Sequence, residues 1–271
     1  GEAKTNLFPW FMYPPVETFV ARMLAKAACR TVGPEKVAVT CRTEESTRRV
    51  AEKLGCDSKT TSEIIENSKY VFLGVKPQML QELTEEIQGQ VAKTDCILVS
   101  MLAGITLERL NEIFPGKKIF RIMPNTPCSV GSGMIFVCGN QKTDDKDMQD
   151  FFALMAKAGL VDELPENLID AASAVAGCGP AFAYMFIQAL ADGGVECGLP
   201  RAKAAKYAAQ MVLGSAEMVL ASAEHPEKLK DDVCSPGGTT ICGVHALERK
   251  GFRAACMDAV TAAYDKTKKL G

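Results

Sequence analysis

The sequence has few of the side chains on which many enzymes and metal sites depend. Its 271 residues include only two histidines, His225 and His245, and a single tryptophan. Eleven cysteines are present without one CxxC pair, so no zinc site built from cysteine and histidine is expected. The odd, scattered cysteines also do not resemble the framework of a small disulfide-linked protein. We therefore predict buried thiols in a reducing compartment, and no metal site.

Strong net charge and long apolar runs are lacking as well. The formal net charge is −2 at pH 7, which gives no reason to expect nucleic acid or an anionic membrane as a partner. No apolar run approaches the roughly 18 residues of a membrane helix. The apolar stretch Leu7–Val16 is interrupted by three prolines and has no small-residue cleavage site after it. These features predict a cytoplasmic protein with no secretory signal and no membrane contact.

The first half of the chain alternates short β-rich runs with helical stretches. Strands are predicted over Lys36–Cys41, Tyr70–Val75, Cys96–Ser100, Lys118–Ile122 and Gly133–Cys138. Helices are predicted over Glu44–Leu54, Met79–Val91, Leu107–Phe114 and Lys146–Ala158. Continuous apolar strands separated by helices indicate an α/β fold with a doubly wound, mostly parallel sheet. Ligands should then bind beyond the carboxyl ends of its strands.

The second half is rich in Ala, Met and Leu and has helical periodicity. Helices are predicted over Pro180–Val195, Arg201–Ala221, Thr239–Arg249 and Arg253–Lys269. We predict a dinucleotide-binding domain of residues 1–166 and an all-helical domain of residues 167–271. The many small residues allow helices to approach closely. We expect the broad apolar surface to be buried against another copy of the chain, although a solitary bundle would also bury it.

A basic and a hydroxyl side chain follow the predicted strand Lys36–Cys41. In a dinucleotide-binding sheet the residue that ends this strand meets the adenosine ribose, where an acidic side chain would accept the free 2′-hydroxyl of NAD. Here Arg42 and Thr43 stand in that place. A guanidinium and a hydroxyl suit a 2′-phosphate, so NADPH is favoured over NADH. An ordinary exposed arginine at the start of a helix is the alternative.

The next two strand ends carry residues that can line a cofactor. Pro77 keeps the turn Val75-Lys76 extended, and an extended backbone can run along a nicotinamide ribose. The run Ser100–Gly104 ends the following strand with Met101 and two small residues, Ala103 and Gly104, that permit close approach. Each alone is a common loop. Together, at successive strand ends, they predict a surface that lines the bound cofactor.

Two loops are more distinctive. In Arg121–Pro127 (RIMPNTP), two prolines flank Asn125, which can hydrogen-bond a carboxamide or serve only as a turn residue. In Ser235–Thr240 (SPGGTT), Gly237 and Gly238 permit close ligand approach, and Thr239 and Thr240 open a helix whose first N–H groups lack partners. Such a helix start attracts a carboxylate, although plain capping is the simpler interpretation.

Five strings, in this order, resemble one enzyme family, the Δ1-pyrroline-5-carboxylate reductases. They are VKPQ at Val75, RIMPNTP at Arg121, GCGPAF at Gly177, ALADGGVECGLPR at Ala189 and LKDDVCSPGGTT at Leu229. The resemblance runs from about Lys36 to the C-terminus. It implies NAD(P)H-dependent reduction of a cyclic imine to L-proline, the last step of proline biosynthesis. It also implies a Rossmann domain followed by a helical dimerisation domain, assembled as a homodimer or a decamer of five dimers.

The same resemblance implies roles for individual residues. Substrate would bind at Ser235, Gly237, Gly238, Thr239 and Thr240, with the backbone N–H groups of the last three holding its carboxylate. The Thr240 hydroxyl would bond the ring nitrogen and help to protonate it as hydride arrives. Most of the rate would come from positioning rather than from a strong acid or base. The family's cofactor contacts match the positions Val75, Lys76, Pro77, Met101, Ala103 and Gly104.

One segment departs from the family. Its members open with a strand and a GxGxxA loop, but here no glycine occurs between Gly1 and Gly33. Thr61 also stands where an asparagine near the adenine is common. Two alternatives therefore stay open: a non-enzymatic dimeric member that has lost its cofactor, and a related imine or β-hydroxyacid reductase. The paired threonines, with no lysine in the loop, favour the imine.

Overall fold

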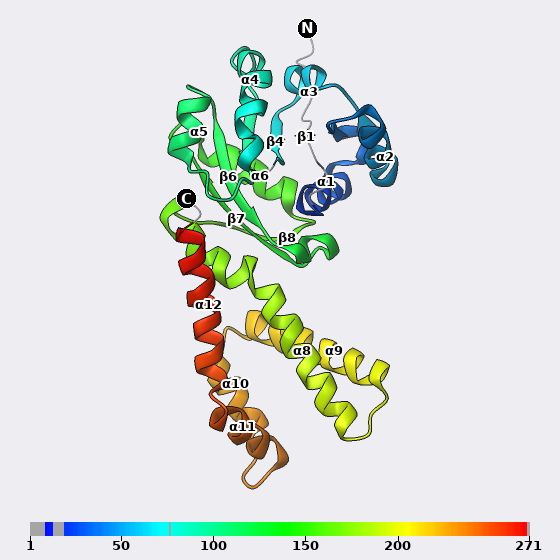
Figure 1. The fold of residues 1–271 in the computed structure, drawn as a ribbon, viewed down its shortest axis with the longest axis vertical. Helices are drawn as coiled ribbons and strands as arrows, with labels where there is room; N and C mark the ends of the chain where they lie inside the picture. The colour runs from blue at the N-terminus through cyan, green and yellow to red at the C-terminus, as the bar shows by residue number, and fades with distance from the viewer. Residues whose placement is uncertain (1–8, 13–18, 76, 270–271) are drawn as a thin grey trace. The chain divides into compact units, whose positions relative to one another are not determined.

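The computed structural model describes residues 9–12, 19–75 and 77–269. The chain forms two compact units, which are described separately (Figure 1). The first comprises Gly1–Gly177 together with Tyr264–Gly271, and the second comprises Cys178–Ala263. The boundary predicted at residues 166 and 167 lies inside the first unit. The chain passes between the units after Gly177 and again after Ala263.

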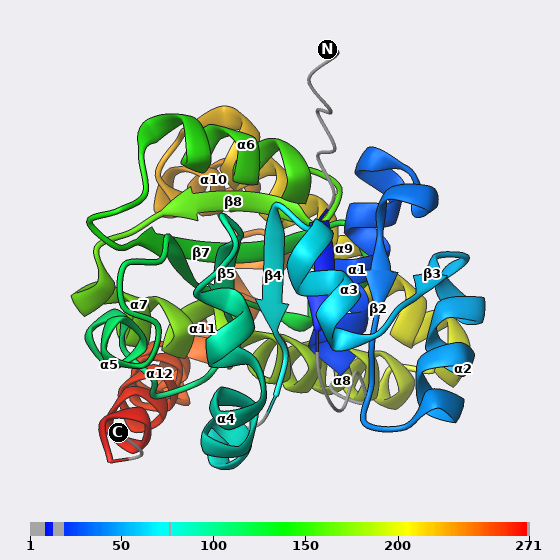
Figure 2. The same ribbon diagram turned by 90° about the horizontal axis from the view of Figure 1, so that it is seen from above.

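The first unit is built on one sheet, which has eight strands in the described part of the chain. Its order is β3-β2-β1-β4-β5-β6-β7-β8. The strands are β1 (Pro9–Met12), β2 (Ala38–Val39), β3 (Asp57–Ser58), β4 (Tyr70–Leu73), β5 (Ile97–Ser100), β6 (Ile119–Pro124), β7 (Gly133–Gly139) and β8 (Gly159–Glu163). Neighbouring strands are parallel except β6 and β7. Figure 2 shows β4 and β5 in the middle of this sheet. The predicted doubly wound, mostly parallel sheet is confirmed.

The N-terminal segment supplies a strand that the sequence did not predict. Residues 9–12 form β1, which pairs in parallel with β2 on one side and β4 on the other. It therefore occupies the place of the first strand in a Rossmann sheet, where the strand order reverses. The rest of Leu7–Val16 lies outside the described residues. The strand that precedes a dinucleotide loop is thus present, although the glycines of that loop are not.

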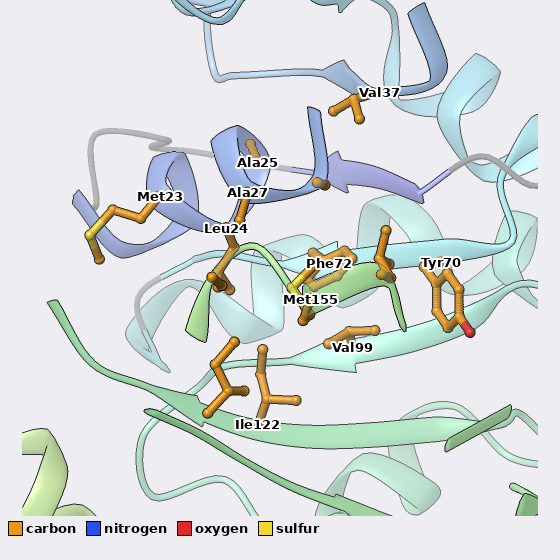
Figure 3. Close-up of a cluster of buried hydrophobic side chains, with 14 of the residues drawn as sticks. Met23, Leu24, Ala25, Ala27, Val37, Tyr70, Phe72, Val99, Ile122 and Met155 are labelled. Atoms are coloured by element: carbon orange, nitrogen blue, oxygen red, sulfur yellow. The ribbon is translucent and has the colours of Figure 1, made fainter. Parts of the chain in front are cut away.

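Two apolar cores cover the two faces of the sheet, because successive strand residues point to opposite sides. One core joins Phe72 and Val99 to α1 (Phe19–Val32), α2 (Glu44–Leu54) and α6 (Asp145–Met155). Figure 3 shows Leu24 of α1 and Met155 of α6 on this face. The other core joins Val71 and Leu98 to α3 (Thr61–Asn67), α4 (Leu80–Val91), α5 (Leu107–Ile113) and α7 (Glu166–Ala172).

Side-chain caps fix where several of these helices begin. The hydroxyls of Thr43, Thr60 and Thr106 accept backbone N–H groups in the first turns of α2, α3 and α5. Asp144 and Asp147 form a capping box at the start of α6. Each cap stands directly after a strand or its loop. The polar residue at each cap therefore fixes the point at which the helix begins.

The second unit is helical, as predicted. It contains α8 (Gly179–Glu196), α9 (Arg201–Ser222), α10 (Pro226–Val233), α11 (Thr239–Arg249) and most of α12 (Phe252–Lys268). Helices α8 and α9 lie side by side and bury Ala191, Ala204 and Ala208 between them (Figure 1). Many large apolar side chains in this unit stay exposed, among them Met185, Met218 and Leu220.

Several expectations were wrong or incomplete. Helices α3, α7 and α10 and strand β8 were not predicted. The expected buried thiols are found for Cys41, Cys96, Cys128 and Cys138, whereas Cys197, Cys242 and Cys256 are exposed. The helical stretch Glu166–Glu196 is also long and apolar enough to cross a membrane, contrary to the expectation that no run approaches that length. Length and composition do not distinguish such a helix from one that packs against protein.

Candidate functional site

Most of the residues predicted to bind the cofactor follow three neighbouring strands of the sheet, whereas Arg42 and Thr43 follow β2. Strands β4, β5 and β6 are parallel, and Leu73 pairs with Ser100, which pairs with Arg121. Their carboxyl ends therefore meet at one edge, and β1 ends at the same edge because Met12 pairs with Leu73. This carboxyl edge lies at the reversal of strand order, the place where open α/β sheets bind ligands.

The loop after β2 is held by a buried threonine. The Thr47 hydroxyl accepts the N–H of Cys41 at 2.8 Å and donates to the carbonyl of Thr43 at 3.0 Å. The Thr43 side chain itself accepts the N–H of Ser46 as the cap of α2, so it has a structural task besides any ligand contact. The Arg42 side chain is exposed.

A cavity of about 440 Å³ opens beside this loop. Its lining includes Arg42, Arg48 and Lys59, and the carboxylates of Glu44, Glu63 and Glu86. The Glu63 carboxylate accepts the N–H and hydroxyl of Thr60 at 2.8 Å each. These hydrogen bonds lower the pKa of Glu63. Arg48 and Lys59 were not predicted as site residues.

The next strand ends also lie at the carboxyl edge. Val75 is buried two residues after β4 ends, and Pro77 opens a 3₁₀ turn before α4. Lys76 lies outside the described residues. After β5, Met101 is half-buried, and Ala103 and Gly104 form a turn in which Gly104 has a φ of 77°. A β-carbon is strained in that conformation, which explains the glycine.

Asn125 follows β6 at the same edge, but its side chain is engaged inside the protein. Its Nδ2 donates to the carbonyl of Ala176 at 3.0 Å, and its Oδ1 accepts the N–H of Met134 at 2.9 Å. Sequence reasoning placed Asn125 against a carboxamide of the cofactor. The structure brings the residue to the expected edge with its amide already committed to two backbone groups.

An ion-pair cluster is centred on Arg121 of β6, the strand that precedes the Asn125 loop. Arg121 of β6 is only 3% exposed and donates to Glu166 at 3.0 Å and to Asp170 at 3.5 Å. Asp170 also accepts from Lys268 near the end of α12 at 3.2 Å. The cluster thereby joins β6, α7 and the last turn of α12 within the first unit.

The predicted substrate loop lies in the second unit and begins with a tight turn. The N–H of Gly238 donates to the carbonyl of Ser235 at 3.0 Å, and Gly237 has a φ of 67°. Proline at the second position and a positive-φ glycine at the third are what a type II turn requires. A β-carbon on Gly238 would lie 2.4 Å from the Ser235 hydroxyl. Gly237 therefore needs to be glycine, whereas a side chain at position 238 would require the Ser235 hydroxyl to move.

Helix α11 begins directly after this turn. Its cap residue is Gly238, which has no side chain to accept the N–H groups of the first turn. Helix starts leave such donors free, and the helix dipole adds partial positive charge there. Thr239 is exposed and Thr240 half-buried at the first two helical positions. The turn therefore presents backbone donors and a hydroxyl group together, which suits a small carboxylate with a neighbouring polar atom.

The predicted site residues therefore form two groups, one for the cofactor and one for the substrate. The cofactor candidates from Arg42 to Asn125 gather at the carboxyl edge of the sheet in the first unit, with Lys76 undescribed. The substrate candidates Ser235–Thr240 gather at the start of α11 in the second. Within the described residues, no group of three or more His, Cys, Asp and Glu side chains is placed to hold a metal ion.

Two family models match the chain. Residues 166–270 match the model for pyrroline-5-carboxylate reductase dimerisation. Residues 19–104 match the model for the NADP oxidoreductases that are dependent on coenzyme F420. The second match begins with α1, after the segment that lacks glycines. The two matches divide the chain in the same order as the predicted domains.

Individual relatives match nearly the whole chain. Pyrroline-5-carboxylate reductase of Synechocystis is 40% identical over 94% of both chains. Pyrroline-5-carboxylate reductase 3 of Xenopus laevis is 39% identical over 89% of this chain and 88% of its own. Among solved structures, the Plasmodium falciparum pyrroline carboxylate reductase with NADP bound has a TM-score of 0.84 at 28% identity, over 97% of this chain and 98% of its own. The reductase of Coxiella burnetii has a TM-score of 0.88 at 27% identity, over 98% and 99%.

Proposed function

Because this chain belongs to the pyrroline-5-carboxylate reductase family, we propose that the turn Ser235–Thr240 holds its substrate and that NADPH is its preferred hydride donor. The chain is an NAD(P)H-dependent oxidoreductase that converts Δ1-pyrroline-5-carboxylate to L-proline, the last step of proline biosynthesis. The comparisons favour neither alternative considered from the sequence. The observation that carries the substrate assignment is the uncapped start of α11 behind a type II turn.

The substrate's carboxylate is the group that this helix start suits. The backbone N–H groups of Gly238, Thr239 and Thr240 are the candidate donors. The Gly238 N–H also closes the turn onto Ser235, so it contributes less than the other two. Two or three N–H donors with a helix dipole behind them bind a carboxylate without any arginine or lysine.

Thr240 is the candidate partner of the imine nitrogen. Its hydroxyl stands one residue inside the helix, next to the backbone donors that hold the carboxylate. In the ring of the substrate, the carboxylate-bearing carbon is bonded to the nitrogen, so one short loop can contact both. Hydride adds to the imine carbon as the nitrogen takes up a proton, and a hydroxyl in contact with the nitrogen stabilises that change. Positioning supplies most of the rate.

The cavity beside Arg42 fits the adenosine end of NADPH. Arg42, Arg48 and Lys59 line a hollow at the end of β2 together with Glu44, Glu63 and Glu86, and the last residue of that strand is not acidic. A 2′-phosphate carries the charge that these cations favour, whereas the 2′-hydroxyl of NADH does not. Val75, Pro77, Met101, Ala103 and Gly104 are the candidate contacts at the nicotinamide end, and Lys76 remains a predicted one. When bound, the cofactor supplies the hydride.

The chain carries a dimerisation domain, and we propose a homodimer, or a decamer of five dimers, as the working assembly. The exposed Met185, Met218 and Leu220 support this, since many large apolar side chains left exposed on one helical unit are typical of a surface that a partner covers. Light scattering on the eluted protein distinguishes the two assemblies. We further propose a cytoplasmic location, where the exposed Cys197, Cys242 and Cys256 stay reduced.

One experiment tests the proposed function directly. Purified protein is mixed with pyrroline-5-carboxylate and either NADPH or NADH, and proline formed is compared with cofactor oxidised. Proline should appear in equal amount to the NADPH consumed, with a lower KM for NADPH than for NADH. A fluorescence titration measures NADPH binding in parallel. Absence of NADPH binding at millimolar concentration would show that the segment without glycines has abolished cofactor binding.

A further inference from the structure

Two hydrogen bonds to backbone groups fix the orientation of the Asn125 amide, whose Oδ1 also accepts the Cys128 thiol at 3.9 Å. Its Oδ1 accepts the backbone N–H of Met134, and its Nδ2 donates to the backbone carbonyl of Ala176. An N–H can only donate and a carbonyl only accept, so the amide has one compatible orientation. Each end of the side chain therefore holds a backbone partner, and one N–H of the amide is left over.

The carbonyl of Ala176 needs this donor because of the sequence that follows it. Ala176 lies in a π-helical turn, Ser173–Gly177, between α7 and α8. In a continuous α-helix its carbonyl would accept the N–H of residue 180. Residue 180 is proline, which has no N–H. The N–H of Ala181 is engaged by Cys178. Asn125 supplies the donor that Pro180 cannot.

This hydrogen bond lies where the chain leaves the first unit. Gly177 is the last residue of that unit before the chain enters α8, and Asn125 stands at the carboxyl edge of the sheet. The candidate cofactor contacts that follow β4 and β5 lie at the same edge, within the first unit. Hydride transfer depends steeply on the geometry between donor and acceptor.

We propose that Asn125 is a positioning residue for hydride transfer, holding the π-helical turn Ser173–Gly177 to the cofactor edge by donating to Ala176 in place of Pro180. The two strings are then linked by this hydrogen bond. RIMPNTP contains the donor, Asn125, and GCGPAF contains Pro180, which lacks the N–H that would otherwise bond the Ala176 carbonyl. The inference rests on the proposed function, because it assigns the cofactor to the carboxyl edge of the sheet. It assigns the Asn125 side chain a role through Ala176 that does not depend on contact with a ligand.

The decisive variant is Asn125→Asp. Aspartate has the shape of asparagine and still accepts the N–H of Met134, but its ionised carboxylate cannot donate to Ala176. At saturating substrate and NADPH we expect kcat to fall about ten- to a hundredfold at pH 7.5, with the NADPH dissociation constant within twofold of the parent. A protonated carboxyl regains a donor. The ratio of variant to parent kcat should therefore rise as the pH is lowered toward 5.

The second variant, Pro180→Ala, tests the origin of the effect. Alanine provides an N–H at position 180, so the Ala176 carbonyl no longer depends on Asn125. The loss of kcat caused by Asn125→Asp should be at least threefold smaller in the Pro180→Ala background than in the parent. Hydrogen exchange of the amides of residues 173–181 provides a readout independent of activity. It should accelerate about tenfold in Asn125→Asp and less in the double variant.

The outcomes separate this inference from the proposed function. An inactive parent chain would overturn the proposed function, while accelerated exchange in Asn125→Asp would still support the hydrogen-bond role. A rise in the NADPH dissociation constant that matches the loss of activity would overturn positioning in favour of a direct ligand. An unchanged kcat would also overturn it, even if the melting temperature fell, because the bond would then serve stability alone. Equal losses in both backgrounds would overturn the link to Pro180.

Discussion

Arg121 on β6 donates to Glu166, the first residue of α7, over 3.0 Å, and it does so from a position that is almost fully buried. The same oxygen of Glu166 accepts the N–H of Leu107 at 2.7 Å, so one carboxylate joins strand β6 to the start of α5. Asp170 completes the cluster on the other side of the guanidinium. The Nε of Arg121 has no partner among the described residues.

Loss of one partner from this pair should destabilise the first unit. Glu166→Ala leaves a buried guanidinium with only Asp170 at 3.5 Å, and we expect the free energy of unfolding to fall by about 2–4 kcal/mol. The double variant Arg121→Met/Glu166→Ala should recover part of that loss, since no buried charge remains. Urea denaturation measures both. The matched control is Glu112→Ala, which removes an exposed pair with Arg109 and should cost less than about 1 kcal/mol. Equal losses for Glu112 and Glu166 would contradict the assignment.

Acid should weaken the start of α6. The N–H of Asp147 and the neighbouring Lys118 hold the pKa of Asp144 below its usual value. A carboxyl group whose pKa is lower in the folded state stabilises the fold above its unfolded pKa, near 4, and this contribution is lost as the pH falls through the folded value. Asp144→Asn keeps the capping oxygen but not the charge. Its melting temperature should fall less than the parent's between pH 5 and 3. Parallel curves would refute the contribution of Asp144.

The sequence predicted the strands and helices that carry continuous or periodic apolar residues. Strands β4, β5 and β6 are almost entirely buried, so their residues are apolar except for Ser100 at the end of β5 and Arg121 within β6. Strand β8 reads GLVDE and is largely exposed, and α10 reads PEKLKDDV with no buried residue, so neither has an apolar pattern to detect. Strand β1 was not predicted because its segment contains prolines, which argue against a central strand. Its pairing between β2 and β4 is a tertiary effect that local residue preferences do not contain.

The candidate site was predictable where a local rule fixed it. Proline followed by two glycines encodes the turn at Ser235 within four residues. Lys59 was missed because it follows a two-residue exposed strand, and only the fold brings it beside Arg42. The bond between Asn125 and Ala176 joins residues far apart in the chain. Pro180 was a visible signal for it, since a proline that follows a helical stretch leaves a carbonyl in need of a donor.

Cofactor preference should depend on Arg42. Arg42→Gln removes the proposed charge-assisted contact to the 2′-phosphate, and we expect the KM for NADPH to rise about ten- to a hundredfold. The KM for NADH should stay within twofold, because its 2′-hydroxyl does not need the cation. Steady-state kinetics with each cofactor measures both values. Arg49→Gln is the matched control: Arg49 is exposed on α2, the helix that follows Arg42, and does not line the cavity. Equal increases in the KM values for NADPH and NADH would show that Arg42 does not recognise the 2′-phosphate.

The hydroxyl of Thr240 should matter more than its methyl group. Thr240→Ala removes the proposed partner of the imine nitrogen, and we expect kcat/KM for pyrroline-5-carboxylate to fall by roughly ten- to a thousandfold. Thr240→Ser keeps the hydroxyl and should stay within about fivefold of the parent. The same change at the exposed neighbour, Thr239→Ala, leaves the backbone N–H in place and provides the control. NADPH binding, measured by fluorescence titration, should be unchanged in all three variants. If Thr240→Ala and Thr239→Ala lose activity equally, the hydroxyl of Thr240 has no special role, and the backbone donors of the turn alone hold the substrate.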